Sequence, residues 1–308
     1  MNTPEPAPPS LFGFEVRSGQ ALRFLRAGGG VEALEIVTAP EPRQRPDVQP
    51  IAQWDLAGTG YRERGTLYQR DGYFEFWTTD VGGYRIEPAR GRIEIPESKD
   101  EILREQRLWG LPTLLCLIYR DDFPLHAAAV EVGDGAVILA APQRYGKTTL
   151  ALAFHRRGHR VLSEDLCCCR LRPGAELLPG PALLRVRPDV YPGSPPPGTH
   201  ILAARPDRVF LALDPDRRGS SAPVPIKAII FLRESPDEIR LEGALPSVAL
   251  ADLWSLNFRL QTAEGRARSF RQLTRLVGGL PCWNLYRPLR LANLEPTVDV
   301  VAGHVRAL

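Results

Sequence analysis

The chain has 308 residues, of which 44% are hydrophobic and 24% are charged, so its composition is that of a folded protein with a sizeable core. Its net charge of +3 comes from 39 basic and 36 acidic residues, a balance that argues against a dedicated nucleic-acid binder. The longest apolar stretch, Leu111–Tyr119, is far shorter than the ~20 residues of a membrane span.

The N-terminus and the cysteines indicate the compartment. Residues 1–10 are polar and proline-rich and carry no secretory signal, so we expect a cytoplasmic protein with no membrane partner. Three of the five cysteines form the run Cys167–Cys169, and adjacent residues on a strand point to opposite faces and pair poorly. No CxxC pair is present to seed a zinc site. We therefore expect free thiols that fill a buried strand.

Residues 1–97 are predicted to form a β-rich N-terminal domain. Residues 1–10 and 39–50 are interpreted as a disordered start and a surface loop because they are rich in proline and charge. Between turn signals, short runs of aromatic and β-branched residues indicate an antiparallel unit. The predicted strands are Leu11–Val16, Glu32–Val37, Gly65–Gln69, Tyr73–Thr78 and Gly83–Ile86.

Residues 98–121 are predicted to form a connecting helix. Ser98 is a candidate N-cap, and Glu101 three residues later completes a capping box. Pro112 is expected to kink or divide this helix, since proline removes a backbone donor and clashes with the preceding turn.

Residues 122–308 are predicted to form an α/β domain. Phe123–Ala141 is typical of a β-hairpin, and its second arm is a continuous apolar run of the kind buried on both faces. A helix is expected over Lys147–Arg157, closed by Gly158, and residues 188–206 are interpreted as an exposed loop. Further predicted strands are His159–Ser163, Leu166–Leu171, Val209–Leu213 and Lys227–Leu232, and further helices are Ala249–Leu260 and Arg268–Leu276.

The sharpest motif is the segment APQRYGKTT at residues 141–149. It matches the phosphate-binding pattern GxxxxGK[ST] with alanine in place of the first glycine, between a predicted strand and a predicted helix. Free N–H groups at the helix start would wrap a phosphate, the Lys147 ammonium would reach the β- and γ-phosphates, and the Thr148 hydroxyl would ligate Mg²⁺. The predicted nucleotide-binding residues are Ala141, Gln143, Arg144, Tyr145, Gly146, Lys147, Thr148 and Thr149.

Lysine occurs at only three positions, so a lysine inside this motif is hard to attribute to background. Arginine supplies every other basic residue of the chain. A cation that assists phosphoryl transfer could therefore not be chosen from the pattern. The candidates are Arg185, Arg187, Arg205 and Lys227.

Two adjacent carboxylates, Glu164 and Asp165, follow a short predicted strand. One would hold Mg²⁺ and the other would accept a proton from a hydroxyl nucleophile, and the sequence leaves open which does which. His126 lies on the strand that pairs with the one entering the phosphate loop. By itself a strand histidine is more often a core residue. His155 and His159 have metal-pair spacing, but Gly158 ends the helix that would align them.

The order and spacing of three segments resemble the catalytic domain of HPr kinase/phosphorylase. These segments are Leu125-His126-Ala-Ala-Ala-Val130, the loop ending Gly146-Lys147-Thr148, and Arg157-Gly-His-Arg-Val-Leu-Ser-Glu164-Asp165. The resemblance covers about residues 122–172, with weaker similarity to about residue 235. It implies an HPr kinase-like P-loop domain, a mixed sheet with helices, that uses ATP and Mg²⁺.

The resemblance also implies roles for the residues that match it. His126 would assist the acidic pair, Lys147 and Thr148 would hold the nucleotide and metal, and Glu164 and Asp165 would serve as metal ligand and base. The family has an aspartate where this chain has Glu164, and the later glutamate-arginine-glycine segment linked to the reverse reaction is not found. Kinase activity without phosphorylase activity is therefore expected.

The β-rich N-terminal domain and the chain length resemble divergent HPr kinase-related proteins of peptide natural-product pathways. Those are similar to lasso-peptide precursor serine kinases, which implies a peptide or small-protein substrate. Members of that family often assemble into oligomers, which implies a homo-oligomer whose number of subunits the sequence does not fix. Two alternatives stay open: a small-molecule kinase, for example for free serine, and a non-catalytic nucleotide-binding regulatory protein.

Overall fold

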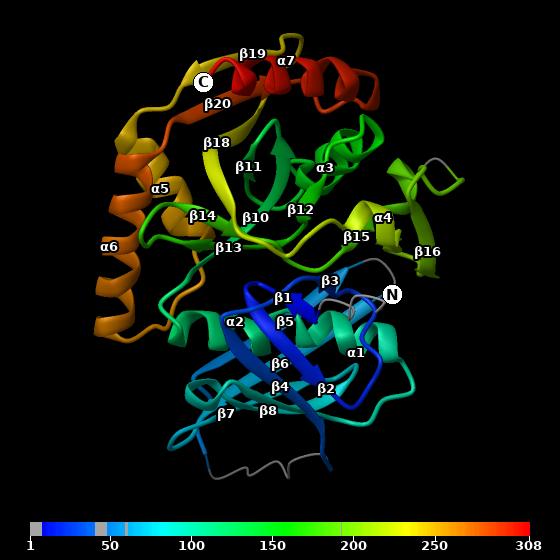
Figure 1. The fold of residues 1–308 in the computed structure, drawn as a ribbon, viewed down its shortest axis with the longest axis vertical. Helices are drawn as coiled ribbons and strands as arrows, with labels where there is room; N and C mark the ends of the chain where they lie inside the picture. The colour runs from blue at the N-terminus through cyan, green and yellow to red at the C-terminus, as the bar shows by residue number, and fades with distance from the viewer. Residues whose placement is uncertain (1–7, 41–47, 59–60, 192) are drawn as a thin grey trace, which may run out of the picture.

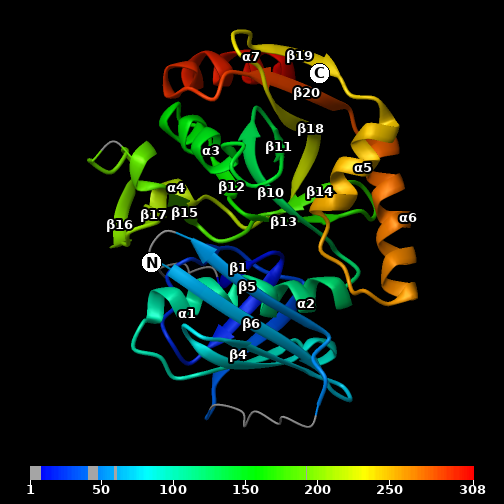
Figure 2. The ribbon, with the colours of Figure 1, turned by 180° about the vertical axis from the view of Figure 1, so that it is seen from behind.

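The computed structural model describes residues 8–40, 48–58, 61–191 and 193–308. Much of the predicted disordered start and surface loop, namely residues 1–7 and 41–47, lies outside these described residues. A β-rich N-terminal half, blue to cyan, lies against a larger half of strands and helices (Figures 1 and 2). In the described part of the chain, no helix has the length and apolar character needed to cross a membrane.

The N-terminal half is built on one nine-stranded sheet in the order β3-β1-β2-β4-β9-β8-β7-β6-β5. The strands are β1 (Pro9–Leu11), β2 (Phe14–Ser18), β3 (Arg26–Ala27), β4 (Glu32–Thr38), β5 (Ala52–Gly58), β6 (Tyr61–Gln69), β7 (Phe74–Thr78), β8 (Gly82–Glu87) and β9 (Arg92–Ile95). The predicted antiparallel, β-rich unit is partly wrong: β4 runs parallel to both β2 and β9, whereas the other pairings among the described residues of this sheet are antiparallel. Parallel neighbours need a crossover rather than a hairpin, and the meander β5–β8 supplies one between β4 and β9.

Helices α1 (Glu101–Leu108) and α2 (Leu111–Tyr119) replace the single predicted connecting helix. The chain divides at Gly110, and Pro112 stands in the first turn of α2, where a missing N–H costs nothing. The predicted cap Ser98 is wrong by two residues, because the Asp100 carboxylate accepts from the Leu103 N–H at 3.0 Å. Both helices lie between the N-terminal sheet and the second half (Figure 1).

The second half contains an eight-stranded mixed sheet in the order β11-β10-β13-β14-β18-β20-β19, with β12 beside β10. A further pairing of β11 with β18 closes a ring of strands. Its strands are β10 (Phe123–Val132), β11 (Gly135–Ala140), β12 (Val161–Ser163), β13 (Leu166–Arg170), β14 (Glu176–Leu178), β18 (Val224–Glu234), β19 (Arg240–Gly243) and β20 (Cys282–Arg287). The predicted hairpin Phe123–Ala141 is confirmed as β10 and β11.

A three-stranded sheet, in the order β15-β17-β16, and five helices complete this half. The strands are β15 (Leu183–Val186), β16 (Thr199–Ala204) and β17 (Val209–Leu213). The helices are α3 (Lys147–Arg156), α4 (Pro215–Arg218), α5 (Pro246–Leu256), α6 (Ala263–Gly279) and α7 (Leu294–Arg306), and the 3₁₀ turns of this half are η2 (Pro188–Val190) and η3 (Leu291–Asn293). A further 3₁₀ turn, η1 (Pro88–Arg90), joins β8 and β9 of the N-terminal half.

Alternate residues of the hairpin strands enter two different apolar clusters. Ala128 and Val130 of β10 pack in the cluster that contains α3 and α7, while Ala127 and Ala129 pack in the cluster that contains α5 and α6. Figures 1 and 2 show these helix pairs on different sides of the sheet. All six residues of β11 are buried, as predicted for a strand covered on both faces.

The predicted exposed loop over residues 188–206 is partly wrong. Its second part forms β16, which pairs antiparallel with β17, and Thr199 at its start is 7% exposed. Backbone pairing with β17 therefore outweighs the local proline and glycine signals.

The structure confirms the prediction that the three adjacent cysteines fill a buried strand as free thiols. Cys167, Cys168 and Cys169 are all fully buried on β13 and carry free thiols. Cys168 packs in the apolar cluster of the N-terminal sheet, and its two neighbours pack in the cluster of α5 and α6.

Arg26 on β3 joins the two halves of the molecule. Its guanidinium is 1% exposed and donates hydrogen bonds to the carbonyls of Gly180 at 2.7 Å, Val161 at 2.9 Å and Leu162 at 3.2 Å. Burial lowers the pKa of Arg26 to about 9. The N-terminal sheet thereby satisfies main-chain acceptors of β12, the strand that leads to the acidic pair Glu164–Asp165.

Candidate active site

The segment between β11 and α3 forms a strand–loop–helix turn with two left-handed residues. Arg144 has φ 69° and Gly146, the N-cap of α3, has φ 77°. No side chain caps this helix start, so its first N–H groups lack intrahelical partners and lie at the positive end of the helix dipole. This arrangement can hold an anion, as the motif predicts.

Gly146 is enclosed by an arginine that the sequence did not single out. A Cβ at this glycine would lie 2.6 Å from Nη2 of Arg287, and that nitrogen donates to the Tyr145 carbonyl at 2.9 Å. Arg287 ends β20 and is only 2% exposed, and burial lowers its pKa. The shape of the phosphate loop therefore depends on the buried side chain of Arg287, which is distant in sequence.

Lys147 is 7% exposed, and its ammonium makes three contacts. Nζ donates to the carbonyls of Ala141 at 2.7 Å and Pro142 at 3.1 Å, and it lies 3.2 Å from Nε2 of His126. Burial lowers the pKa of Lys147, while Asp165 and Glu164 oppose that shift. The lysine is thus held at the loop and connected to the predicted histidine.

His126 connects Lys147 to Asp165. Its Nδ1 lies 3.3 Å from Oδ1 of Asp165, a proximity set by the pairing of His126 with Leu166 at the start of β13. An ammonium only donates, so Nε2 must accept and Nδ1 carries the proton that faces Asp165. Burial lowers the pKa of His126, and Asp165 opposes this. Burial thus favours the neutral form of the ring, with its proton on Nδ1 when Lys147 is charged.

The two carboxylates differ in environment. The Glu164 side chain is 8% exposed, and burial raises its pKa although Arg185 opposes the shift. The Asp165 side chain is 48% exposed; desolvation opposes its ionisation, yet Arg185 and then His126 hold the pKa of Asp165 below its usual value. The two environments therefore favour ionisation of Asp165 over ionisation of Glu164.

Arg185 is the one of the four candidate cations that contacts the acidic pair in the described part of the chain. Its Nε lies 3.0 Å from Oε2 of Glu164 and its Nη2 lies 2.7 Å from Oδ2 of Asp165. The other three candidates form ion pairs elsewhere: Arg187 with Asp189, Arg205 with Asp100, and Lys227 with Asp134. Arg185 lies on β15, a strand that the sequence analysis missed.

The oxygen donors of this site suit Mg²⁺. The Thr148 hydroxyl in the first turn of α3 donates a hydrogen bond to Glu164, and Asp165 is the next residue. Among the described residues no group of three or more His, Cys, Asp or Glu forms a metal cage. Mg²⁺ takes few protein ligands and completes its octahedron with phosphate oxygens and water, so a hydroxyl and one or two carboxylates fit it.

The remaining predicted loop residues surround this centre. Gln143 and Arg144 are exposed, Thr149 is half-buried, and Ala141 is 3% exposed. Tyr145 packs against the apolar cluster of α3 and α7, which explains how a bulky residue fits beside the turn.

Comparisons with known proteins add little. No protein-family profile matches the chain, and no curated protein matches its sequence. Among solved structures, the chain is similar to the Hpr(Ser) kinase/phosphatase from Coxiella burnetii, with 14% identity and a TM-score of 0.31 over 60% of this chain and 97% of that chain. This likeness is too low to assign a function, which rests on the site residues themselves.

Proposed function

We propose that the protein is an ATP- and Mg²⁺-dependent kinase that transfers the γ-phosphoryl group to a serine hydroxyl of a peptide or small protein. One observation carries the proposal: a continuous set of contacts runs from the loop lysine through His126 to Asp165, and from there through Arg185 to Glu164 and Thr148. Phosphoryl transfer needs these parts, namely a phosphate cradle, a metal site and a base.

The loop and Lys147 would bind the nucleotide phosphates. The free N–H groups at the start of α3 would donate hydrogen bonds to the nucleotide phosphates. Lys147 would exchange its hydrogen bonds to the Ala141 and Pro142 carbonyls for hydrogen bonds to phosphate oxygens. Thr148 and Glu164 would hold Mg²⁺, which neutralises charge on the phosphates when bound.

Asp165 is the better placed of the two carboxylates to act as base. It is ionised and half-exposed, so an acceptor hydroxyl can reach it, whereas Glu164 is buried against Thr148. As the serine oxygen forms its bond to the γ-phosphorus, the hydroxyl proton passes to Asp165 and the bond to the β-phosphate oxygen breaks, which releases ADP. His126 orients the Asp165 carboxylate through its Nδ1–H.

Arg185 would offset negative charge beside the transferred group. The guanidinium of Arg185 contacts both Glu164 and Asp165. An arginine in this place would stabilise the charge that spreads over the γ-phosphoryl oxygens in the transition state.

The test uses γ-labelled ATP, Mg²⁺ and a size-fractionated extract of the source cells. We expect label on a short polypeptide, lost in Lys147→Ala. Asp165→Asn should abolish transfer and keep ATP affinity within a few-fold, while Asp189→Asn, which alters an exposed ion pair, should keep both. Label only in the metabolite fraction would indicate a small-molecule kinase, and bound ATP without any transfer would indicate a regulatory protein.

A further inference from the structure

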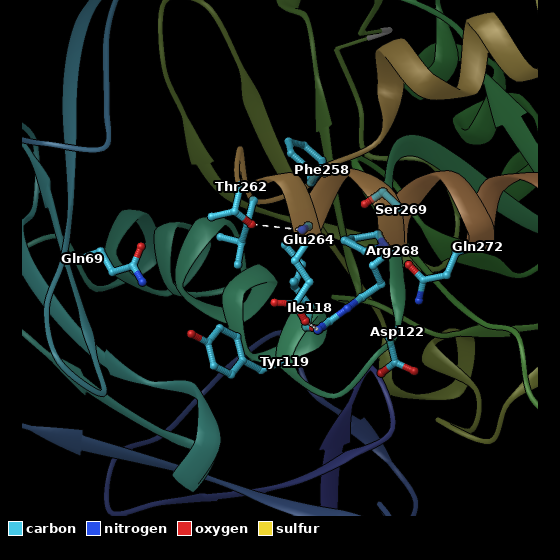
Figure 3. Close-up of a pocket in the computed structure, with 13 residues that line it drawn as sticks. Gln69, Ile118, Tyr119, Asp122, Phe258, Thr262, Glu264, Arg268, Ser269 and Gln272 are labelled. Atoms are coloured by element: carbon cyan, nitrogen blue, oxygen red, sulfur yellow. Dashed lines mark hydrogen bonds and ion pairs between the residues drawn. The ribbon is translucent and has the colours of Figure 1, made fainter.

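A cavity of about 340 Å³ is lined by residues of α2, β10 and α6, by the segment before α6, and by Gln69 of β6. Figure 3 shows side chains from α2, from α6 and from Gln69 converging on it. It is lined by Gln69, Ile118, Tyr119, Asp122, Pro124, Phe258, Leu260, Thr262, Glu264, Gly265, Arg268, Ser269 and Gln272. Its volume is in the range of natural ligand sites.

Phe258 connects the cavity with the catalytic groups. Its ring lies edge-on to the His126 imidazole with centroids 6.3 Å apart, and 37% of the residue is exposed. An exposed aromatic ring beside a catalytic histidine is costly in water and favours an apolar contact from a ligand.

The wall that carries Phe258 is fixed to the strand of His126. The Phe258 N–H and the Asn257 side-chain amide both donate to the Pro124 carbonyl, at 3.2 Å and 2.9 Å, and Asn257 bridges antiparallel to Leu125. Asn257 is 6% exposed, and its Oδ1 has no hydrogen-bond partner among the described residues. The part of the cavity wall that carries Phe258 therefore keeps a set position relative to the strand of His126.

The lining offers hydrogen bonds and an apolar floor but little free charge. Asp122 is 4% exposed and paired with Arg120 and Arg170, and Glu264 is paired with Arg268. The apolar floor consists of Ile118, Pro124, Phe258 and Leu260, and the uncharged polar groups are Gln69, Thr262, Ser269 and Gln272. Such a mixture suits a main chain that carries one apolar side chain, rather than a phosphate or a metal ion.

We propose that this cavity binds the polypeptide that flanks the acceptor serine and selects a bulky apolar side chain within five residues of it. Phe258 lines the cavity and its ring lies against His126, and His126 in turn contacts Asp165, the proposed base. A polypeptide whose serine lies at Asp165 therefore has the cavity beside its path. Gln69 belongs to the N-terminal sheet, which thus forms one edge of the peptide site.

This inference rests on the proposed kinase activity, and one experiment separates the two. The probes are synthetic peptide pools with a fixed serine and each amino acid in turn at the five positions on either side, together with free L-serine. Incorporation from γ-labelled ATP is measured for the wild type, Phe258→Ala and Phe258→Leu. The matched control is Phe270→Ala, which removes an exposed aromatic on α6 that packs on Trp254 outside the cavity.

The wild type and the Phe270→Ala control should prefer leucine, isoleucine or phenylalanine by about tenfold at one of the five positions on either side of the serine, a factor of the size that burial of an apolar side chain provides. Phe258→Ala should lose this preference, and Phe258→Leu should keep most of it, which covers the case in which the alanine variant does not fold. Transfer without selection at any position, or selection that survives both Phe258 substitutions, overturns the peptide site but leaves the kinase. No transfer to any probe overturns both.

Discussion

Gly146→Ala tests whether the phosphate loop is held in place by Arg287. Gly146 has φ 77°, where an alanine is strained, and the added Cβ would lie 2.6 Å from Nη2 of the buried arginine. The arginine must then give up its 2.9 Å bond to the Tyr145 carbonyl or force the loop to move. Either response alters the N–H groups proposed to hold the phosphates.

The size of the effect follows from these two contributions. A left-handed alanine costs about 1–2 kcal/mol, and loss of a hydrogen bond from a charged donor costs about 1.5–3 kcal/mol. Gly158 is the matched control because it has φ 84° and no atom of the described residues lies within 4 Å of its Cβ position. Gly158→Ala should thus lower the free energy of unfolding by only the first amount, and Gly146→Ala by roughly 2.5–5 kcal/mol.

The assay is urea unfolding of both variants together with ATP binding by calorimetry. We expect ATP affinity to fall at least tenfold in Gly146→Ala and to stay unchanged in Gly158→Ala. Arg287→Met alone removes the hydrogen bond to the Tyr145 carbonyl, so adding it to Gly146→Ala should cost clearly less than the sum of the two single changes. Equal destabilisation of the two glycine variants would refute the contact with Arg287.

Three further predictions concern other contacts. Arg26→Met should lower the free energy of unfolding by about 3–5 kcal/mol because it removes hydrogen bonds from a charged donor to three buried carbonyls, of which that of Leu162 keeps the Gly180 N–H as a donor. Arg17→Met, which breaks an exposed ion pair, should change the free energy of urea unfolding by less than about 1 kcal/mol. Arg185→Met should move the acid limb of the pH–rate profile to higher pH. Without the guanidinium the pKa values of Asp165 and Glu164 rise, so the base becomes protonated at a higher pH. The control Arg187→Met should leave the acid limb in place. Burial raises the pKa of Cys169 to about 12, so native protein at pH 8 should resist alkylation of this thiol by iodoacetamide until denaturant is added, and rapid labelling of native protein would contradict the buried strand.

The elements around the phosphate loop could be predicted because local and tertiary preferences agree there. The strand over residues 135–140 is uniformly apolar, Gly158 stops the helix, and turn residues separate the hairpin arms. The local sequence on either side of the motif is therefore sufficient to place it between a strand and a helix. The division into an N-terminal domain, a connecting helix and a catalytic domain stays a prediction.

Other elements could not be predicted because their stability comes from partners distant in sequence. β14 and β15 have only three and four residues, and β16 lies among prolines and glycines, so each depends on a neighbouring strand. Helix α7 did carry a signal, since Val298, Val301, Ala302 and Val305 follow helical spacing and are buried. The sequence analysis missed this helix although its periodicity was sufficient to predict it.

The same limit applies to the candidate site. The motif residues were located by spacing, and the structure brings Lys147, His126 and Asp165 into contact, while their functional roles stay proposals. Selection of Arg185 from many arginines required the fold, because only β15 brings it to the acidic pair. Arg287 and Phe258 had no signal in the sequence, since each matters through a contact across the molecule.

The apolar cluster of the N-terminal sheet also covers the thiol of Cys168, on the strand that follows Glu164 and Asp165. Cys168 stands three residues after Asp165, is fully buried against that cluster, and has a pKa raised well above its usual value by burial. A chain that lacked the first sheet would expose this sulfur to water and peroxide, and oxidation to a sulfenic acid would place a new polar group on the strand that follows the acid pair. The N-terminal sheet thus keeps the Cys168 thiol away from solvent, in addition to the backbone contacts that it makes through Arg26.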